Sequence, residues 1–320
     1  MHGLFLVAMC GDGCATRWTI IPMSRTAGRS PTSSVSDSVV QRWRSVGAEF
    51  GWICRYCLFS TSPLDNDDLP AFLFRSHDWN SVKLSELPDP GVPFGLQLPC
   101  ETTNPDLKQL APMKSLDTLI IGDTKITDDG LKELASLPGL RRLKVCVCAI
   151  GDASLRHLGR LRSIQSLDLS DTQATDAGLV YLGTLTGLQE LDFTRTRITD
   201  AGLAHLSSLT NLRGLGLSDT KVTGVGFRGL GALRELRVLD LDGAPVTDEG
   251  LREITMLTGL EELNLFRAQI TDAGLKELAA HQTLRKLHLA ETNVQSNSIN
   301  NRATVESCVL EELKKSGVSC

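Results

Sequence analysis

The sequence has no long apolar run and no excess of basic charge. None of its apolar stretches approaches the ~20 residues that a membrane-spanning helix requires. Its 33 Lys and Arg against 38 Asp and Glu give a net charge of −5. A partner held through phosphates needs a basic face, so we expect neither a nucleic-acid nor a membrane partner. No Lys or Arg precedes the apolar stretch before Cys10, so we predict no signal peptide and a cytoplasmic location.

The sequence also lacks a disulfide framework and the common catalytic motifs. Its 9 cysteines are an odd number without dense spacing, so we expect reduced thiols. It contains no Walker-type phosphate loop, no Gly-x-Ser-x-Gly elbow and no His-Glu-x-x-His zinc helix. His157 and His205 are expected on a solvated helical face, and His288 has no Ser or Cys nucleophile in a matching place. We therefore predict no enzyme, no cofactor, and no catalytic or metal-binding residue.

What the sequence does contain is an internal repeat without insertions or deletions. Its period is 24 residues, the spacing between successive members of a row of branched or small apolar residues. The row consists of Ile126, Ile150, Ala174, Ile198, Val222, Val246, Ile270 and Val294. Eight positions in one register predict a single repeated structural unit.

Each unit contains the pattern of a short strand followed by a short helix. Leu191 and Phe193 are one of eight Leu-x-Leu type pairs, and alternation at period two predicts a half-buried strand. Thr196 follows, in a row of Thr, Cys and Ala residues that we expect to bond to turn backbone. Thr199 and Asp200 then suit a helix start, as N-cap and as a charge against the helix dipole.

One such unit cannot bury both its strand face and its helix face, whereas stacked units bury them against each other. Strands stack at ~4.8 Å and helices with side chains are ~10 Å wide, so the stack must curve with the strands inside. We predict an α/β solenoid with a curved parallel sheet on its concave face and short helices on its convex face.

The repeat resembles a known family. The unit LQELDFTRTRITDAGLAHLSSLTN, residues 188–211, is similar to bacterial leucine-rich repeats with the pattern LxxLxLxxTxITDxGL. It is also similar to the cysteine-containing repeats of F-box proteins, which share ITDxGL. The resemblance covers about 60% of the chain, and it implies protein recognition, usually on the concave side.

The composition and the limits of the repeat divide the chain into four parts. All four tryptophans precede residue 80, and residues 1–81 show no sustained periodicity, so we predict an irregular or poorly ordered segment. Residues 82–101 are interpreted as an N-terminal cap, 102–304 as the solenoid with eight strands, and 305–320 as a C-terminal cap helix and tail. Leu96 and Leu98 suggest a further strand one residue out of register.

Two alternatives concern the N-terminal segment. Four thiolates could form a tetrahedral zinc site, and the candidates are Cys10, Cys14, Cys54 and Cys57; unpaired thiols are the competing interpretation. Asp68-Leu69-Pro70 is similar to the opening of an F-box, although the helical apolar pattern that should follow is missing.

A binding surface is predicted on the concave face, because residues that flank the inward-pointing strand positions point outward. Its centre is acidic and its ends are basic. The candidate partner-binding residues are Lys144, Asp168, Glu190, Asp192, Gly216, Asp240, Asp242, Glu262, Asn264, Phe266 and His288.

Three residues of the concave face carry particular expectations. Phe266 is the expected aromatic anchor, and Gly214 and Gly216 are expected to leave a shallow spot. We hypothesise a non-catalytic protein-interaction scaffold whose partner carries a basic or mixed segment. The runner-up is a substrate-recognition subunit of an enzyme assembly, such as an F-box-like ubiquitin ligase adaptor. For each candidate residue, the competing interpretation is that its side chain is a solvated surface group that binds no partner.

Overall fold

The computed structural model describes residues 50–52, 73–76, 84–278 and 281–292, with side chains for 84–278 and 281–292. Several predictions lie outside these residues. They are the zinc site at Cys10, Cys14, Cys54 and Cys57, the F-box-like Asp68-Leu69-Pro70, the C-terminal cap at 305–320, and all of segment 1–81 except two short strands. The four-part division of the chain therefore stays a prediction.

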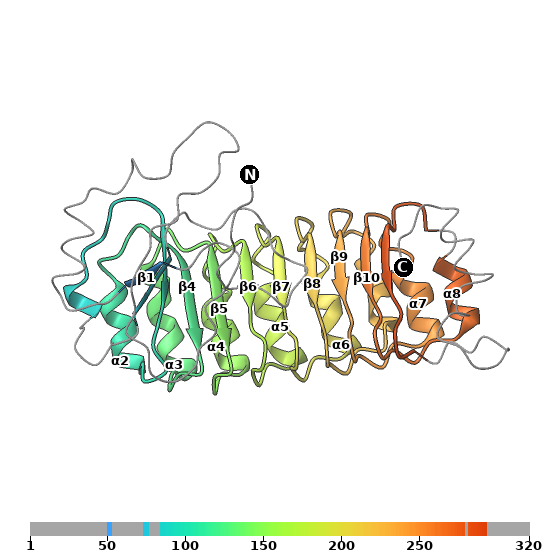
Figure 1. The fold of residues 1–320 in the computed structure, drawn as a ribbon, viewed down its shortest axis with the longest axis horizontal. Helices are drawn as coiled ribbons and strands as arrows, with labels where there is room; N and C mark the ends of the chain where they lie inside the picture. Colours follow the sequence, from blue (N-terminus) through green and yellow to red (C-terminus); the bar gives the residue numbers. More distant parts are fainter. Residues whose placement is uncertain (1–49, 53–72, 77–83, 279–280, 293–320) are drawn as a thin grey trace, which may run out of the picture. The chain divides into compact units, whose positions relative to one another are not determined.

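The described strands form one sheet whose order follows the sequence (Figure 1). Strand β1 pairs antiparallel with β2, and β2 to β11 each pair in parallel with the next strand. The eight predicted repeat strands are β4 to β11. The strands are β1 (Phe50–Trp52), β2 (Leu73–Ser76), β3 (Phe94–Gln97), β4 (Leu116–Gly122), β5 (Arg142–Cys146), β6 (Ser166–Asp168), β7 (Glu190–Asp192), β8 (Gly214–Gly216), β9 (Val238–Asp240), β10 (Glu262–Asn264) and β11 (Lys286–His288).

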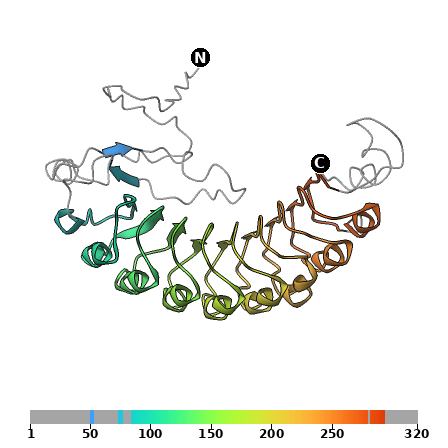
Figure 2. The same ribbon diagram turned by 90° about the horizontal axis from the view of Figure 1, so that it is seen from below.

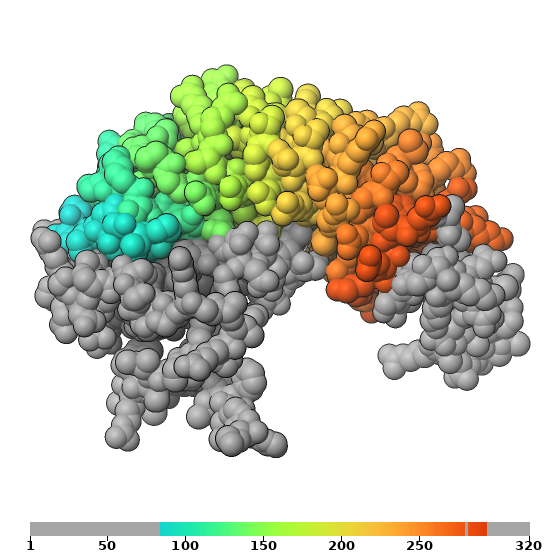
Figure 3. Space-filling view, turned by 90° about the horizontal axis from the view of Figure 1, so that it is seen from above, coloured from blue at the N-terminus to red at the C-terminus, as the bar shows by residue number. Residues whose placement is uncertain are grey.

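Short helices alternate with the repeat strands and lie on the outer side of the curve, with the strands inside (Figure 2). The α-helices are α2 (Asn104–Leu107), α3 (Asp128–Leu131), α4 (Asp152–Leu158), α5 (Asp176–Leu182), α6 (Asp200–Leu203), α7 (Asp248–Ile254) and α8 (Asp272–Leu278). Short 3₁₀ helices are η2 (Leu84–Glu86), η3 (Lys108–Leu110), η4 (Lys132–Ser136), η5 (Ala204–Leu206) and η6 (Val225–Leu230). Successive repeats form side-by-side bands in the space-filling view (Figure 3). None of the helices in the described ranges is long and apolar enough to cross a bilayer.

The core lies between the sheet and the helices and follows the repeat. Leu167 pairs with Leu191, and Leu191 pairs with Leu215, so equivalent residues stack along the solenoid. Leu191, Phe193 and the other inward residues are almost fully buried. The predicted extra strand exists as β3, where Leu96 pairs with Leu119 after a register irregularity at Phe94 and Gly95.

The Asp of the Thr-Asp pair joins most of the described repeats to the next one, which the sequence pattern alone does not predict. Asp176 accepts hydrogen bonds from the backbone N–H of Thr199 at 2.8 Å and from its hydroxyl at 2.6 Å. Asp152 bonds Thr175 in the same way, and so does Asp248 with Thr271. Each of these Asp residues therefore begins its own helix and also binds the N-cap Thr of the following helix.

The Gly of Thr-Asp-x-Gly-Leu leaves room for this contact. A Cβ at Gly202 would lie 2.4 Å from Oδ1 of Asp176, and one at Gly178 would lie 2.6 Å from Oδ1 of Asp152. A larger side chain at Gly202 or Gly178 would crowd the carboxylate, whereas in repeat two Ser154 takes this place and Asp128 still accepts from the N–H of Gly151 at 2.8 Å. The motif thus encodes a contact between repeats.

A left-handed backbone residue follows each repeat strand at the same 24-residue period. Such residues carry a steric penalty that Gly avoids and that Asn and Asp tolerate best. The row consists of Asp123, Val147, Asp171, Arg195, Asp219, Gly243, Arg267 and Glu291. Val147, with φ 54° and a β-branched side chain, fits this conformation least well.

The Thr row after the strands is structural, as predicted. Thr172 donates to Leu169 O at 2.7 Å, and Thr196 donates to Phe193 O at 2.6 Å. Cys148 takes the same place in repeat two and donates to Cys146 O at 3.3 Å. These buried polar groups each satisfy a turn carbonyl.

Repeat five departs from the others where its sequence does. Gly224 replaces the usual Asp and has φ 98°, and a Cβ there would lie 2.8 Å from Cα of Gly250. A 3₁₀ helix, η6, replaces the α-helix in this repeat. The Asp–Thr contact is therefore interrupted after repeat five and resumes at Asp248.

Candidate functional site

The candidate site is the concave face of strands β5 to β11. The predicted partner-binding residues all lie on these strands or directly after β9 and β10. Strand alternation places them on the side opposite the buried leucines. Most are partly exposed, but Gly216 is buried and His288 is exposed.

Much of the predicted acidic centre is neutralised by partners on neighbouring strands. Lys144 forms an ion pair with Asp168, and Arg267 pairs with Asp242 at 2.8 Å. Glu262 lies 3.0 Å from the ammonium of Lys286 and 3.5 Å from His288 Nε2. The acidic surface is therefore smaller than the sequence suggests.

The acids at the ends of the strands also stabilise the backbone. Oδ1 of Asp168 accepts from the N–H of Ser170 at 2.9 Å, and Oδ1 of Asp192 accepts from the N–H of Thr194 at 2.8 Å. Asp240 and Asn264 make the same contact with the residue two positions on. This local Asx contact was missed, although an Asp or Asn two residues before a turn position is its sequence signal.

Two of the predicted acids, Asp192 and Asp240, lie outside these ion pairs, although the charge of Lys144 opposes the raised pKa of Asp192. Neither forms an ion pair with any residue in the described part of the chain. Burial raises the pKa of Asp192, and the charge of Asp168 raises it further. Burial also raises the pKa of Asp240, although a backbone hydrogen bond from Asp242 opposes this. Both carboxylates are held in a partly desolvated state that disfavours their charge.

The space expected above Gly216 is occupied. A Cβ at Gly216 would lie 2.6 Å from Oδ1 of Asp192, so the Asp192 carboxylate leans over β8. The shallow spot was inferred from the missing side chain alone, and the neighbouring strand fills it. Phe266 is partly exposed, and the guanidinium of Arg267 lies 5.3 Å from its ring centroid. One face of the predicted anchor thus already holds a cation.

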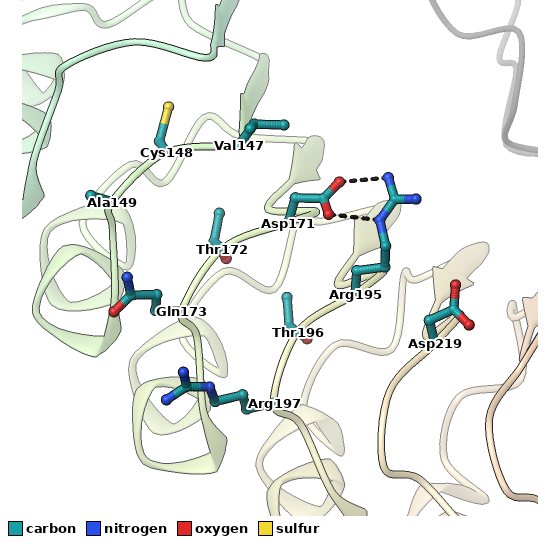
Figure 4. A pocket seen from close by; sticks show the side chains of 10 residues that line it. All are labelled: Val147, Cys148, Ala149, Asp171, Thr172, Gln173, Arg195, Thr196, Arg197 and Asp219. Carbon is teal, nitrogen blue, oxygen red and sulfur yellow. Dashed lines mark hydrogen bonds and ion pairs between the residues drawn. The ribbon is translucent and has the colours of Figure 1, made fainter.

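A second surface lies at the carboxyl-terminal ends of the strands, at an open pocket of about 540 Å³ (Figure 4). Asp171 and Arg195 form a bidentate ion pair on its wall, with both N–O distances at 2.6 Å. These residues were not predicted from the sequence, because the left-handed backbone positions that present them were not recognised. The lining residues are Val147, Cys148, Ala149, Asp171, Thr172, Gln173, Arg195, Thr196, Arg197 and Asp219.

Comparison with known proteins agrees with the geometry. A model described as Leucine Rich repeat matches residues 113–135, 185–207, 233–254 and 258–279. The chain contains leucine-rich repeats in these four segments. A comparison with curated protein sequences gives no match.

Solved structures show the same fold at low sequence identity. An internalin of Listeria monocytogenes, InlF, is 21% identical with a TM-score of 0.51, covering 70% of this chain and 65% of its own. TLR13, solved in complex with ssRNA13, is 20% identical with a TM-score of 0.50, covering 67% of this chain and 32% of its own. The chain thus spans less than two thirds of the internalin and about a third of TLR13. Leucine-rich repeats commonly mediate protein–protein interaction and are typically non-enzymatic scaffolds.

The two cysteines of repeat two, Cys146 and Cys148, are not activated as nucleophiles. Burial raises the pKa of Cys146 to about 11, so its thiol stays protonated at neutral pH. Cys148 is buried and lies 3.3 Å from the hydroxyl of Thr124. No group of three or more His, Cys, Asp or Glu residues in the described ranges could hold a metal ion.

Proposed function

We propose that the chain is a non-catalytic recognition scaffold that binds a protein partner with a basic or mixed segment on its concave face. The observation that carries this proposal is a row of partly exposed polar side chains, one from each successive strand over most of β5 to β11. Lys144, Asp168, Asp192, Asp240 and Asn264 belong to this row. A parallel sheet fixes their spacing, so a partner would meet a preformed surface.

The charge of this face favours a protein over a nucleic acid. TLR13 was solved with an RNA, but phosphates on this chain would meet Asp192 and Asp240, which have no ion pair in the described structure. Bringing like charges together opposes binding. A basic peptide segment would instead be attracted by these carboxylates.

Affinity capture with the intact chain, read by mass spectrometry, tests the proposal. Charge reversal by Asp192→Lys together with Asp240→Lys should remove the captured partners. The matched control is Asp129→Lys with Glu249→Lys, because both acids are exposed in the first turn of convex helices. A partner set unchanged by the concave reversal would contradict the proposal. Capture of ubiquitin ligase components would favour the runner-up adaptor function.

A further inference from the structure

The hydroxyl–carboxylate pairs of repeats three and four are followed by a gap on β8. In repeat three the hydroxyl of Ser170 donates to Asp168 on the same strand end, at 2.6 Å. In repeat four the side chain of Thr194 contacts Asp192 and lowers its pKa. In repeat five the corresponding residues are Ser218 and Gly216, so the hydroxyl has no carboxylate of its own.

Ser218 is left as a buried hydroxyl with an unused hydrogen-bonding group. Only 6% of the residue is exposed, and no atom of the described residues meets hydrogen-bond geometry with its Oγ. Asp240 lies close enough for this hydroxyl to lower its pKa, but the contact lacks the geometry of a hydrogen bond. Buried polar groups are rarely left unpaired in folded proteins, which points to a ligand group at this place.

Two carboxylates border the same gap. Asp192 on β7 leans over Gly216, and Asp240 on β9 lies beside Ser218. The acids further along the face, Asp168 and Glu262, already have cationic partners. Two carboxylates without an ion pair, on β7 and β9, therefore flank the strand that carries the unpaired hydroxyl.

We propose that Asp192 and Asp240 anchor an arginine side chain of the partner between them, over β8, with Ser218 as an additional acceptor. This inference rests on the proposed function and specifies where and how the partner is held. Strands β7 and β9 are two steps of ~4.8 Å apart. A planar guanidinium with hydrogen bonds of ~2.8 Å on both sides spans such a gap better than an ammonium.

Peptide selection on the intact chain tests the anchor. A library of random peptides, about 12 residues long and long enough to cross several strands, is selected at neutral pH, and the affinity of enriched peptides is measured by fluorescence anisotropy. We expect an arginine whose replacement by the isosteric, uncharged citrulline weakens binding by about tenfold or more. Asp192→Asn with Asp240→Asn should cause a similar loss and leave no further effect of citrulline.

Matched variants separate local pairing from general charge. Glu261→Gln removes a charge directly before β10 from a carboxylate that is already paired with Arg237 and Arg285, so affinity should change by less than about threefold. Gly216→Ser keeps both carboxylates but should displace that of Asp192, whose Oδ1 would lie 2.6 Å from the new Cβ, so it should weaken arginine-dependent binding. The melting temperature of each variant shows whether it is folded.

Other results would contradict the arginine anchor, the proposed function or both. Enrichment of peptides without arginine, or unchanged affinity in the Asp192/Asp240 variant, overturns the anchor. If Phe266→Ala weakens binding in that case, the concave face still binds the peptide and only the arginine anchor is wrong. If no concave substitution affects binding, the proposed function fails as well. Displacement of the peptide by millimolar Ca²⁺ would assign the gap to a metal ion and overturn the arginine proposal.

Discussion

Asp176 and Thr199 lie in adjacent repeats, and the carboxylate of the first accepts both the backbone N–H and the hydroxyl of the second, at 2.8 and 2.6 Å. The same arrangement recurs along the convex side wherever Asp and Thr are both present. Because each repeat contacts only its neighbours, the stability of the solenoid depends on such contacts between repeats.

Removing this contact should destabilise the fold. Asp176→Ala loses two charge-assisted hydrogen bonds and leaves the Thr199 N–H without its partner, so we expect a loss of about 2 kcal/mol in urea unfolding. Asp129→Ala is the control, because Asp129 is an exposed acid in the first turn of α3 and should cost less than about 0.5 kcal/mol. Equal effects of the two substitutions would show that the contact between repeats contributes nothing.

Gly202→Ala should also destabilise, against the usual helical preference for Ala. The new Cβ would lie 2.4 Å from Oδ1 of Asp176, and we expect a loss of about 1–3 kcal/mol. The control is Gly229→Ala in η6, where a Cβ would meet nothing within 4 Å. That substitution should be neutral or stabilise the fold by up to about 1 kcal/mol. Chemical denaturation that gives both variants the same sign would contradict the steric explanation.

Val147→Asn should stabilise the protein. Val147 has φ 54°, and a β-branched residue is strained there, whereas Asn tolerates the left-handed region. Its side chain is 54% exposed, so little packing is lost. We expect a gain of about 1 kcal/mol, measured as a higher urea midpoint with unchanged slope. Val180→Asn, at an exposed position in α5, should give no gain.

The stability of the concave face should depend on pH through Asp192. Charged groups around it are Asp168 on β6 and Lys144 on β5, while β8 contributes only Gly214 and Gly216. Because the folded-state pKa is raised, the wild type is most stable with this carboxyl protonated, and that stability is lost as pH rises through the raised pKa. Asp192→Asn should therefore raise the melting temperature at pH 7, by about 1–3 °C.

The pH profile separates this effect from a general change in packing. The gain from Asp192→Asn should disappear as pH falls to the ordinary aspartate range, because the wild-type carboxyl is then also neutral. Asp176→Asn should instead lower the melting temperature at pH 7, since a carboxylate that accepts two hydrogen bonds is lost. A destabilising effect of Asp192→Asn at pH 7 would contradict the account of an uncompensated carboxylate.

The fold was predictable because one pattern repeats without interruption. The Leu-x-Leu pairs set the strands, and their constant spacing sets the parallel register that pairs Leu167 with Leu191. The role of Asp176 was only half predicted, since a helix start is visible in one repeat but its bond to Thr199 needs two. The left-handed residues were missed because Val147, Arg195 and Arg267 are not typical of that conformation.

The candidate site was less predictable than the fold. Alternation identified the outward residues, but the pairing of Asp168 with Lys144 depends on side-chain direction across strands. The same holds for Asp192, whose lean over Gly216 removes the space expected there. Sequence spacing gives the row of a residue, whereas its charge partner is set by contacts that only the folded sheet defines.

The central claim is that the concave face, and not the convex one, holds the partner. A photo-crosslinking amino acid placed at Asn264, on the concave strand β10, should form a covalent adduct with a protein partner under native conditions. The same probe at Lys276, in the convex helix α8, should give none. Adducts formed equally from both positions, or only from Lys276, would contradict the account.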